Sequence, residues 1–133
     1  MAKAQILIVE DEMIVAIYIQ NKLKRLGYSV AAIASSGQEA VKKVEETHPD
    51  LVLMDIHLKG DMNGVEAAQQ IRTRFHIPII YLTAHSDDDT LQRAKVTEPF
   101  GYILKPFEER ALHTTIEMAL YRYETEKRLR EER

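Results

Sequence analysis

Five runs of apolar residues recur along the chain at regular intervals, and four of them are continuous rather than alternating with polar residues. Short continuous runs of this kind are typical of parallel strands that are covered by helices on both faces. The five predicted strands are residues 5–9, 28–33, 51–54, 77–82 and 101–105.

The segments between these runs have the spacing of amphipathic helices. In the first, residues 12–26, the apolar residues fall on one face: Ala16, Ile19, Leu23 and Leu26. Further helices are predicted from Ser36 to about Thr47, after Gly64, from Asp87 and from about Glu108. Ser36 and Glu39 have the spacing of a capping box. Because strand and helix alternate five times, the pattern predicts an α/β domain with a parallel sheet and right-handed crossovers.

Composition narrows the class of protein. A chain of 133 residues with 45% hydrophobic and 29% charged residues suits one globular domain. The formal net charge of -3 gives no general attraction to nucleic acid or to a membrane. Cysteine is absent, which excludes disulfides, thiolate catalysis and cysteine–zinc sites. The apolar run near the N-terminus is too short for a signal peptide or a membrane span, so we expect a cytoplasmic protein.

The residues whose side chains could bind a ligand or react lie at the ends of the predicted strands. Glu10 and Asp11 follow the first strand, Asp55 the third, Thr83 the fourth, and Lys105 ends the fifth. Ligands of open parallel sheets bind beyond the carboxyl ends of the strands, so these side chains should meet. Clustered carboxylates repel one another and suit a hard divalent cation such as Mg²⁺. Lysine and threonine beside the cation are suited to phosphoryl oxygens, and aspartate is a known phosphoryl acceptor.

The motifs around these residues resemble the receiver domain of two-component response regulators, the family of the chemotaxis regulator. The resemblance runs from Ala4 to Thr125 and rests on four motifs: VED (9–11), LMD (53–55) with Gly64 downstream, TA (83–84) and GYILKPF (101–107). It implies a flavodoxin-like (βα)₅ fold, a doubly wound sheet of five parallel strands in the order 2-1-3-4-5. It also implies a signalling switch that catalyses its own phosphorylation and dephosphorylation and is not a conventional enzyme.

The resemblance assigns a role to each matching residue of the acidic pocket. Asp55 would be the phosphoacceptor, Asp11 a direct Mg²⁺ ligand and Glu10 a ligand through water. The backbone carbonyl of His57 would complete the protein's share of the coordination. Glu10 departs from the family, where Asp is commoner at this position. The loop after Asp55 is one residue longer than usual and carries Lys59 and Gly60 where the family often has a proline.

The resemblance also predicts how the phosphoryl group would be bound and sensed. Lys105 and Thr83 would bind its oxygens, and the peptide bond between Lys105 and Pro106 is expected to be cis. Thr83 and Tyr102 match the pair whose coordinated movement changes the surface formed by the fourth helix, fifth strand and fifth helix. The implied phosphodonor is a histidine kinase or a histidine phosphotransfer protein.

Two further regions carry expectations of their own. Ile14 and Tyr18 point away from the buried face of the first helix, so we interpret them as a docking patch for the phosphodonor. Residues 4–123 are predicted to form the receiver, and residues 124–133 a charged helical extension. We interpret the extension as a connector to a downstream domain; the alternative is a frayed, solvated tail. The chain would then be a stand-alone regulator or the front of a longer protein such as a sensor kinase.

The expected protein partners include a second copy, held through the fourth-helix, fifth-strand and fifth-helix face or through the C-terminal helix. No direct partner among nucleic acids or membranes is expected.

Two other classes compete with the switch. A phosphatase of the haloacid-dehalogenase type also uses an Asp nucleophile with Mg²⁺, but it needs a second Asp two residues later, where this chain has His57. A flavodoxin-like binding module would need a phosphate-binding loop rich in Ser, Thr and Gly after the first strand. The acids that follow Val9 would repel a phosphate at that place.

Overall fold

The computed structural model describes residues 4–84 and 88–132. Its strands are β1 Gln5–Val9, β2 Ser29–Ala34, β3 Leu51–Asp55, β4 Ile79–Thr83 and β5 Gly101–Leu104. Its helices are α1 Met13–Arg25, α2 Gly37–Thr47, α3 Gly64–Phe75, α4 Asp88–Ala94 and α5 Glu109–Glu131, and the 3₁₀ turn η2 Lys95–Thr97 follows α4. The predicted start of the fourth helix at Asp87 lies outside the described residues.

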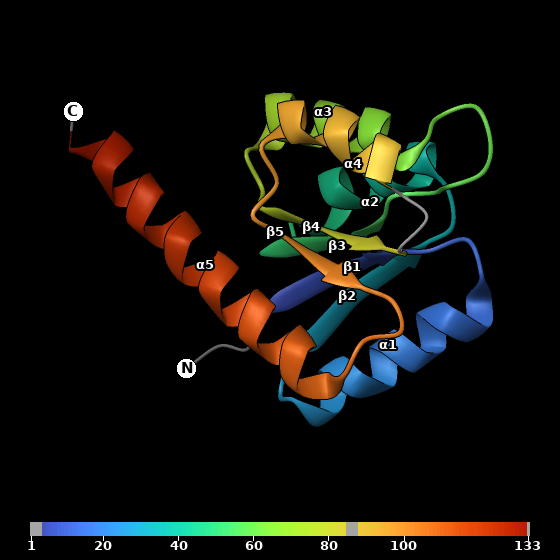
Figure 1. The fold of residues 1–133 in the computed structure, drawn as a ribbon. Helices are drawn as coiled ribbons and strands as arrows, with labels where there is room; N and C mark the ends of the chain where they lie inside the picture. Colours follow the sequence, from blue (N-terminus) through green and yellow to red (C-terminus); the bar gives the residue numbers. More distant parts are fainter. Residues whose placement is uncertain (1–3, 85–87, 133) are drawn as a thin grey trace.

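The five strands form one parallel sheet in the order β2-β1-β3-β4-β5 (Figure 1). This confirms the predicted fold. Four strands end one residue away from the predicted end, and two strands start later than predicted. The second strand begins after Tyr28, because the amide of Tyr28 donates to the carbonyl of Leu23 at the end of α1. The fourth begins after Pro78, which has no N–H to donate to the sheet.

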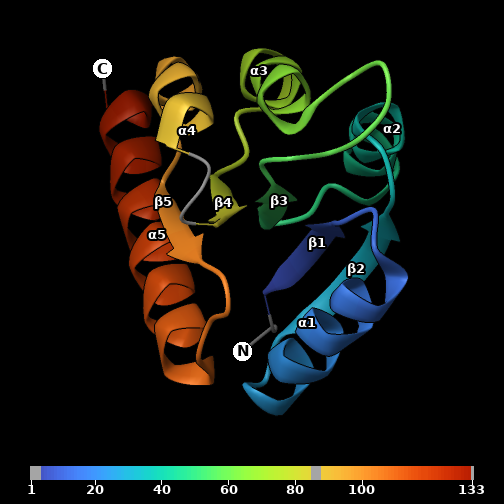
Figure 2. The ribbon, with the colours of Figure 1, turned by 45° about the vertical axis from the view of Figure 1, so that its right-hand side comes forward.

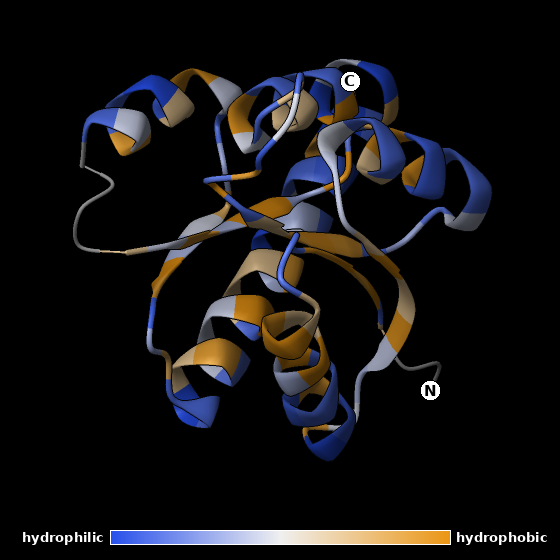
Figure 3. Ribbon diagram, turned by 90° about the vertical axis from the view of Figure 1, so that its right-hand side faces the viewer, coloured by the Kyte–Doolittle hydropathy of each residue, from blue (hydrophilic) through white to orange (hydrophobic). Residues whose placement is uncertain are grey.

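Helices cover both faces of the sheet, as Figure 2 shows. On one face α2, α3 and α4 pack over Val9, Met54 and Tyr81. On the other face α1 and α5 pack over Ile8, Leu53 and Leu82. Strand residues are therefore buried on both sides, which explains their continuous apolar runs. The strands are mostly hydrophobic, whereas the helices alternate between hydrophobic and hydrophilic residues (Figure 3).

The fifth helix is the longest element, with 23 residues. Its inward residues Leu112, Ile116 and Ala119 are buried against the sheet, and Tyr123 is half-buried beyond them. The helix continues to Glu131 without a break. Among the described residues, no helix combines the length and the apolar character that a membrane crossing requires.

Candidate functional site: an acidic pocket at the carboxyl edge of the sheet

Three acids converge where β1 and β3 end. Val9 pairs with Met54 in the parallel register, so the residues that follow these two strands lie next to each other. Carboxylate oxygens of Glu10, Asp11 and Asp55 all lie within 4.8 Å of one another. The sheet topology thus brings together side chains that are far apart in the sequence.

Two of these acids are buried and are held by backbone amides. Glu10 is 1% exposed and Asp55 is 6% exposed. The amide of Glu12 donates to Oε1 of Glu10 at 3.2 Å, and the amide of His57 donates to Oδ1 of Asp55 at 3.0 Å. These bonds fix the direction of both carboxylates. The side chain of His57 is exposed.

Lys105 supplies a positive charge from the end of β5. Its Nζ lies 3.3 Å from Oε2 of Glu10 and 3.6 Å from Oδ1 of Asp55. Its amide donates to the carbonyl of Thr83 at 2.6 Å, which ties the end of β5 to the end of β4. The peptide bond between Lys105 and Pro106 is cis, as expected. Lys105 therefore stands between the two buried carboxylates.

The charges in the pocket do not balance. Burial, followed by repulsion from Asp55, raises the pKa of Glu10 from its ordinary value of 4.5 to about 7, although Lys105 opposes the shift. Burial alone would lower the pKa of Lys105, but the carboxylates of Asp55 and Glu10 raise it above its ordinary value. A further cation beside the acids would relieve their repulsion.

The donor set fits Mg²⁺. The ion prefers carboxylate oxygens and usually keeps several waters, and three carboxylates within 4.8 Å offer such ligands. The resemblance to receiver domains also implies Mg²⁺ at an acidic pocket of this kind. Glu10, Asp11 and Asp55 are the residues that would hold it here. When bound, the ion would neutralise the repulsion between these carboxylates and an anionic phosphoryl group.

The loop after Asp55 folds back onto the pocket. The amide of Lys59 donates to Oδ2 of Asp11 at 3.2 Å, so the longer loop is tied to the third acid. The loop turns at Gly60, whose φ of +104° favours glycine. At Gly64 a Cβ atom would come within 2.3 Å of the carbonyl oxygen of Asp55. Gly64 thus lets the start of α3 pass directly against the backbone of Asp55.

Thr83 and Tyr102, the expected switch pair, lie along one groove. Thr83 is buried at the end of β4, and Tyr102 is 39% exposed on β5. Both line a groove of about 530 Å³ between α4 and β5, together with Leu91, Gln92, Lys95 and Leu104. In the sheet register Thr83 pairs with Leu104 and Tyr102 with Tyr81. The pair therefore shares a surface, two residues apart along neighbouring strands.

The two predicted docking residues lie on the outer face of α1. Ile14 is 85% exposed and Tyr18 is 49% exposed. Sequence reasoning missed two neighbours on the same stripe, Met13 and Ile17, which are also exposed. It also missed Phe107, whose ring lies 6.2 Å from that of Tyr18 and which lines a small apolar hollow with Lys105. Helical spacing alone could have added Ile17, one turn after Met13.

Sequence reasoning also missed the polar contact behind the groove between α4 and β5. The hydroxyl groups of Tyr81 and Thr97 lie 2.8 Å apart in the core. Strand alternation places Tyr81 on the same face as Thr83, which was an available signal. The partner Thr97 comes from η2, and no local pattern predicts that pairing.

The fold and the pocket together define a class: an open parallel α/β domain with a cluster of acids and a lysine at the carboxyl ends of its strands. Comparison with known families gives the same class. The model of the response regulator receiver domain matches residues 6–117. The chain therefore belongs to the receiver domain family of two-component signalling proteins.

Individual relatives support the assignment to this family. Over 119 residues the chain is 36% identical to the transcriptional regulatory protein PdtaR of Mycobacterium tuberculosis. This alignment covers 90% of this chain and 58% of that protein. It is 34% identical over 121 residues to the alkaline phosphatase synthesis transcriptional regulatory protein PhoP of Bacillus subtilis, of which 50% is covered. The chain thus spans about half the length of these curated relatives.

A solved structure supports the same fold. The signal receiver domain of a modulated diguanylate cyclase from Desulfovibrio desulfuricans G20 superposes with a TM-score of 0.89 and 39% sequence identity. The alignment covers 94% of this chain and 99% of that one. The family match and these relatives do not support the phosphatase alternative.

Proposed function

We propose that this chain is a phosphorylation-dependent switch whose Asp55 accepts a phosphoryl group from a histidine kinase or a histidine phosphotransfer protein. The observation that carries the proposal is the position of Asp55: buried, oriented by the amide of His57, and flanked by Glu10, Asp11 and Lys105. In this family setting, an aspartate so placed is suited to attack phosphorus.

The transfer would exchange one bond for another. A carboxylate oxygen of Asp55 attacks the phosphorus atom, and the bond from phosphorus to the donor's imidazole nitrogen breaks, with the electron pair remaining on the nitrogen. Lys105 would pair with the phosphoryl oxygens once its contact with Asp55 is replaced, and Thr83 would donate its hydroxyl to them. Glu10, Asp11, Asp55 and the backbone carbonyl of His57 would hold Mg²⁺.

Phosphorylation of Asp55 would change the surface formed by α4, β5 and α5. Side-chain exposure supports this role, because apolar residues gather on that face without cover from the described part of the chain: Val96, Tyr102, Leu104, Met118 and Tyr121. This face, or the end of α5, would hold a second copy in a homodimer. Residues 4–123 would act as the receiver and residues 124–133 as a connector to whatever carries the output.

Incorporation of phosphate tests the proposed function directly. After incubation with Mg²⁺ and acetyl phosphate, intact mass spectrometry should show one added phosphoryl group on the wild type. Asp55→Asn should show none, and excess chelator should prevent the gain. Asp50→Asn, an exposed acid at the opposite edge of the sheet, is the matched control and should behave as the wild type. A mass gain that survives Asp55→Asn would contradict the proposal.

A further inference from the structure

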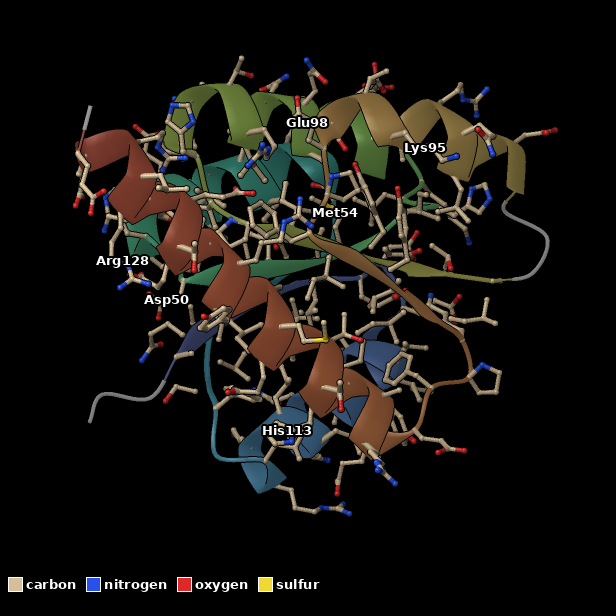
Figure 4. The ribbon with its side chains drawn as sticks, turned by 60° about the vertical axis from the view of Figure 1, so that its left-hand side comes forward. Asp50, Met54, Lys95, Glu98, His113 and Arg128 are labelled. Atoms are coloured by element: carbon tan, nitrogen blue, oxygen red, sulfur yellow. The ribbon has the colours of Figure 1, made fainter. Side chains whose placement is uncertain are left out.

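The hydroxyl of Tyr81 makes a buried hydrogen bond to a side chain from another element. Tyr81 on β4 is completely buried, and its hydroxyl lies 2.8 Å from Oγ1 of Thr97. Thr97 is the last residue of η2, the turn that follows α4 (Figure 4, where Lys95, the first residue of this turn, and Glu98, the residue after it, are labelled). The bond therefore connects β4, the neighbour of the edge strand β5, to the turn that follows α4.

The direction of this hydrogen bond follows from proton counting. The hydroxyl of Thr97 donates its one proton to the carbonyl of Ala94 at 2.6 Å. It can therefore only accept from Tyr81, which must be the donor. Burial raises the pKa of Tyr81 to about 12, so the phenol keeps its proton at neutral pH. The donor is thus permanently available.

The ring of Tyr81 also supports the switch residue. Tyr81 and Tyr102 are partners in the register of β4 and β5. Their rings are stacked, with centroids 6.1 Å apart and planes 21° apart. Tyr102 lies on the edge strand and its other side is open to the α4–β5 groove. Any movement of Tyr102 along that groove changes its contact with Tyr81.

The far side of η2 is fixed as well. The guanidinium of Arg72 on α3 donates from Nε to the carbonyl of Thr97 at 3.2 Å and lies 3.7 Å from the carboxylate of Glu98. The backbone of η2 is thus held by α3, while its buried hydroxyl is held by Tyr81. Because η2 is held in place, a tilt of the Tyr81 ring would weaken the hydrogen bond between Tyr81 and Thr97.

We infer that Tyr81 is the positioning residue of the switch: its ring supports Tyr102 and its hydroxyl, bound to Thr97, ties that support to the end of α4. The inference rests on the proposed function and adds a named connection to it. In the unphosphorylated domain the Tyr81–Thr97 bond holds α4 and Tyr102 in the arrangement described here. Movement of Tyr102 on phosphorylation works against this bond.

Removal of one hydroxyl tests the inference. Tyr81→Phe keeps the ring and deletes the donor, and should speed amide hydrogen exchange in residues 91–98 of the unphosphorylated protein. It should also raise the rate of phosphorylation by acetyl phosphate by about fivefold, the lower end of usual coupling between two sites, because the lost bond favours the unphosphorylated state. Thr97→Val should have the same effect, and Thr97→Ser, which keeps the hydroxyl, should behave as the wild type.

Two comparisons make the result specific. Combining Tyr81→Phe with Thr97→Val should add nothing to either single change, because both remove the same bond. Tyr28→Phe is the matched control, since the Tyr28 hydroxyl donates to Glu117 on the opposite face of the sheet. It should leave exchange in residues 91–98 and the phosphorylation rate unchanged.

The outcomes separate this inference from the proposed function. A wild type that takes up no phosphoryl group would contradict the proposed function. A wild type that is phosphorylated at a rate equal to or above that of Tyr81→Phe would overturn the positioning role alone. Additive effects of the two substitutions would overturn it as well.

Discussion

Glu10 follows the last residue of β1 and is almost completely buried beside a second acid, Asp55. Burial and the charge of Asp55 raise the pKa of Glu10 to about 7 from 4.5. The folded chain therefore binds this proton more tightly than the unfolded chain does. The contribution of Glu10 to the free energy of unfolding is fully present below pH 4.5 and is lost as the pH rises through about 7.

Glu10→Gln should remove this dependence on pH. Without metal, the free energy of unfolding of the wild type should fall between about pH 5 and about pH 8, by on the order of 2 kcal/mol more than that of Glu10→Gln. Urea unfolding in the presence of a chelator measures both proteins. Glu124→Gln, an exposed acid outside the pocket, is the matched control and should follow the wild type. Parallel profiles of wild type and Glu10→Gln would show that the buried acid carries no such shift.

At the scale of single elements, α1 combines a buried face with an exposed apolar stripe. Ala16, Ile19 and Leu23 are buried against the sheet, so the exposed stripe that includes Ile14 and Tyr18 has no role in the core. The stripe begins beside Asp11 and reaches the ring of Phe107, next to Lys105. Exposed apolar side chains next to the acidic pocket favour a protein partner.

Ile14→Lys and Tyr18→Ala should slow phosphoryl transfer from the histidine kinase or phosphotransfer protein that serves as donor by about tenfold or more, because each removes apolar contact area. Phosphorylation by acetyl phosphate, which needs no docking, should not change. Gln70→Lys, at an exposed position on α3 outside both surfaces, is the control. Equal transfer rates for Ile14→Lys, Tyr18→Ala and the wild type would remove the docking role from this stripe.

The ends of the helices show which capping contacts a local sequence pattern predicts and which it does not. Ser36 caps α2 as predicted, since its side chain accepts from the amide of Glu39. The carboxylate of Glu39, however, accepts from the amide of Ser35 rather than from that of Ser36. The reciprocal capping box is on α3, between Asn63 and Glu66. Spacing predicts the cap, but the direction in which the chain enters the helix decides which amide the acid reaches.

At the scale of the whole molecule, α5 runs from the carboxyl ends of the strands to their amino ends. It starts near the acidic pocket, after the loop that carries Lys105, and its later turns pass the opposite edge. There Tyr123, Glu124 and Lys127 line a hollow of about 390 Å³ with Pro49 and Ile77, which lie near the starts of β3 and β4. Arg122 and Glu126 pair at 3.3 Å along the helix. The helix thus keeps contact with the domain beyond Tyr123.

Amide hydrogen exchange should therefore show protection past Tyr123, to about Lys127, and a decline toward Glu131 where the side chains are exposed. Arg122→Ala should shorten the protected segment by removing the pair with Glu126. Arg110→Ala, at an exposed position in the first turn of the same helix, serves as the control. Exchange at the unfolded rate from Glu124 onward would contradict a helical connector.

The sequence by itself determined the order of elements, the parallel sheet and the residues that end each strand. Continuous apolar runs report burial on both faces, and the residue after a buried strand is placed by the strand itself, which is why Glu10, Asp11, Asp55 and Lys105 could be named in advance. Only the tertiary structure decided the contacts between elements. Lys105 between Glu10 and Asp55, Lys59 against Asp11 and Tyr81 bonded to Thr97 depend on how helices and loops pack on the sheet, which no local pattern encodes.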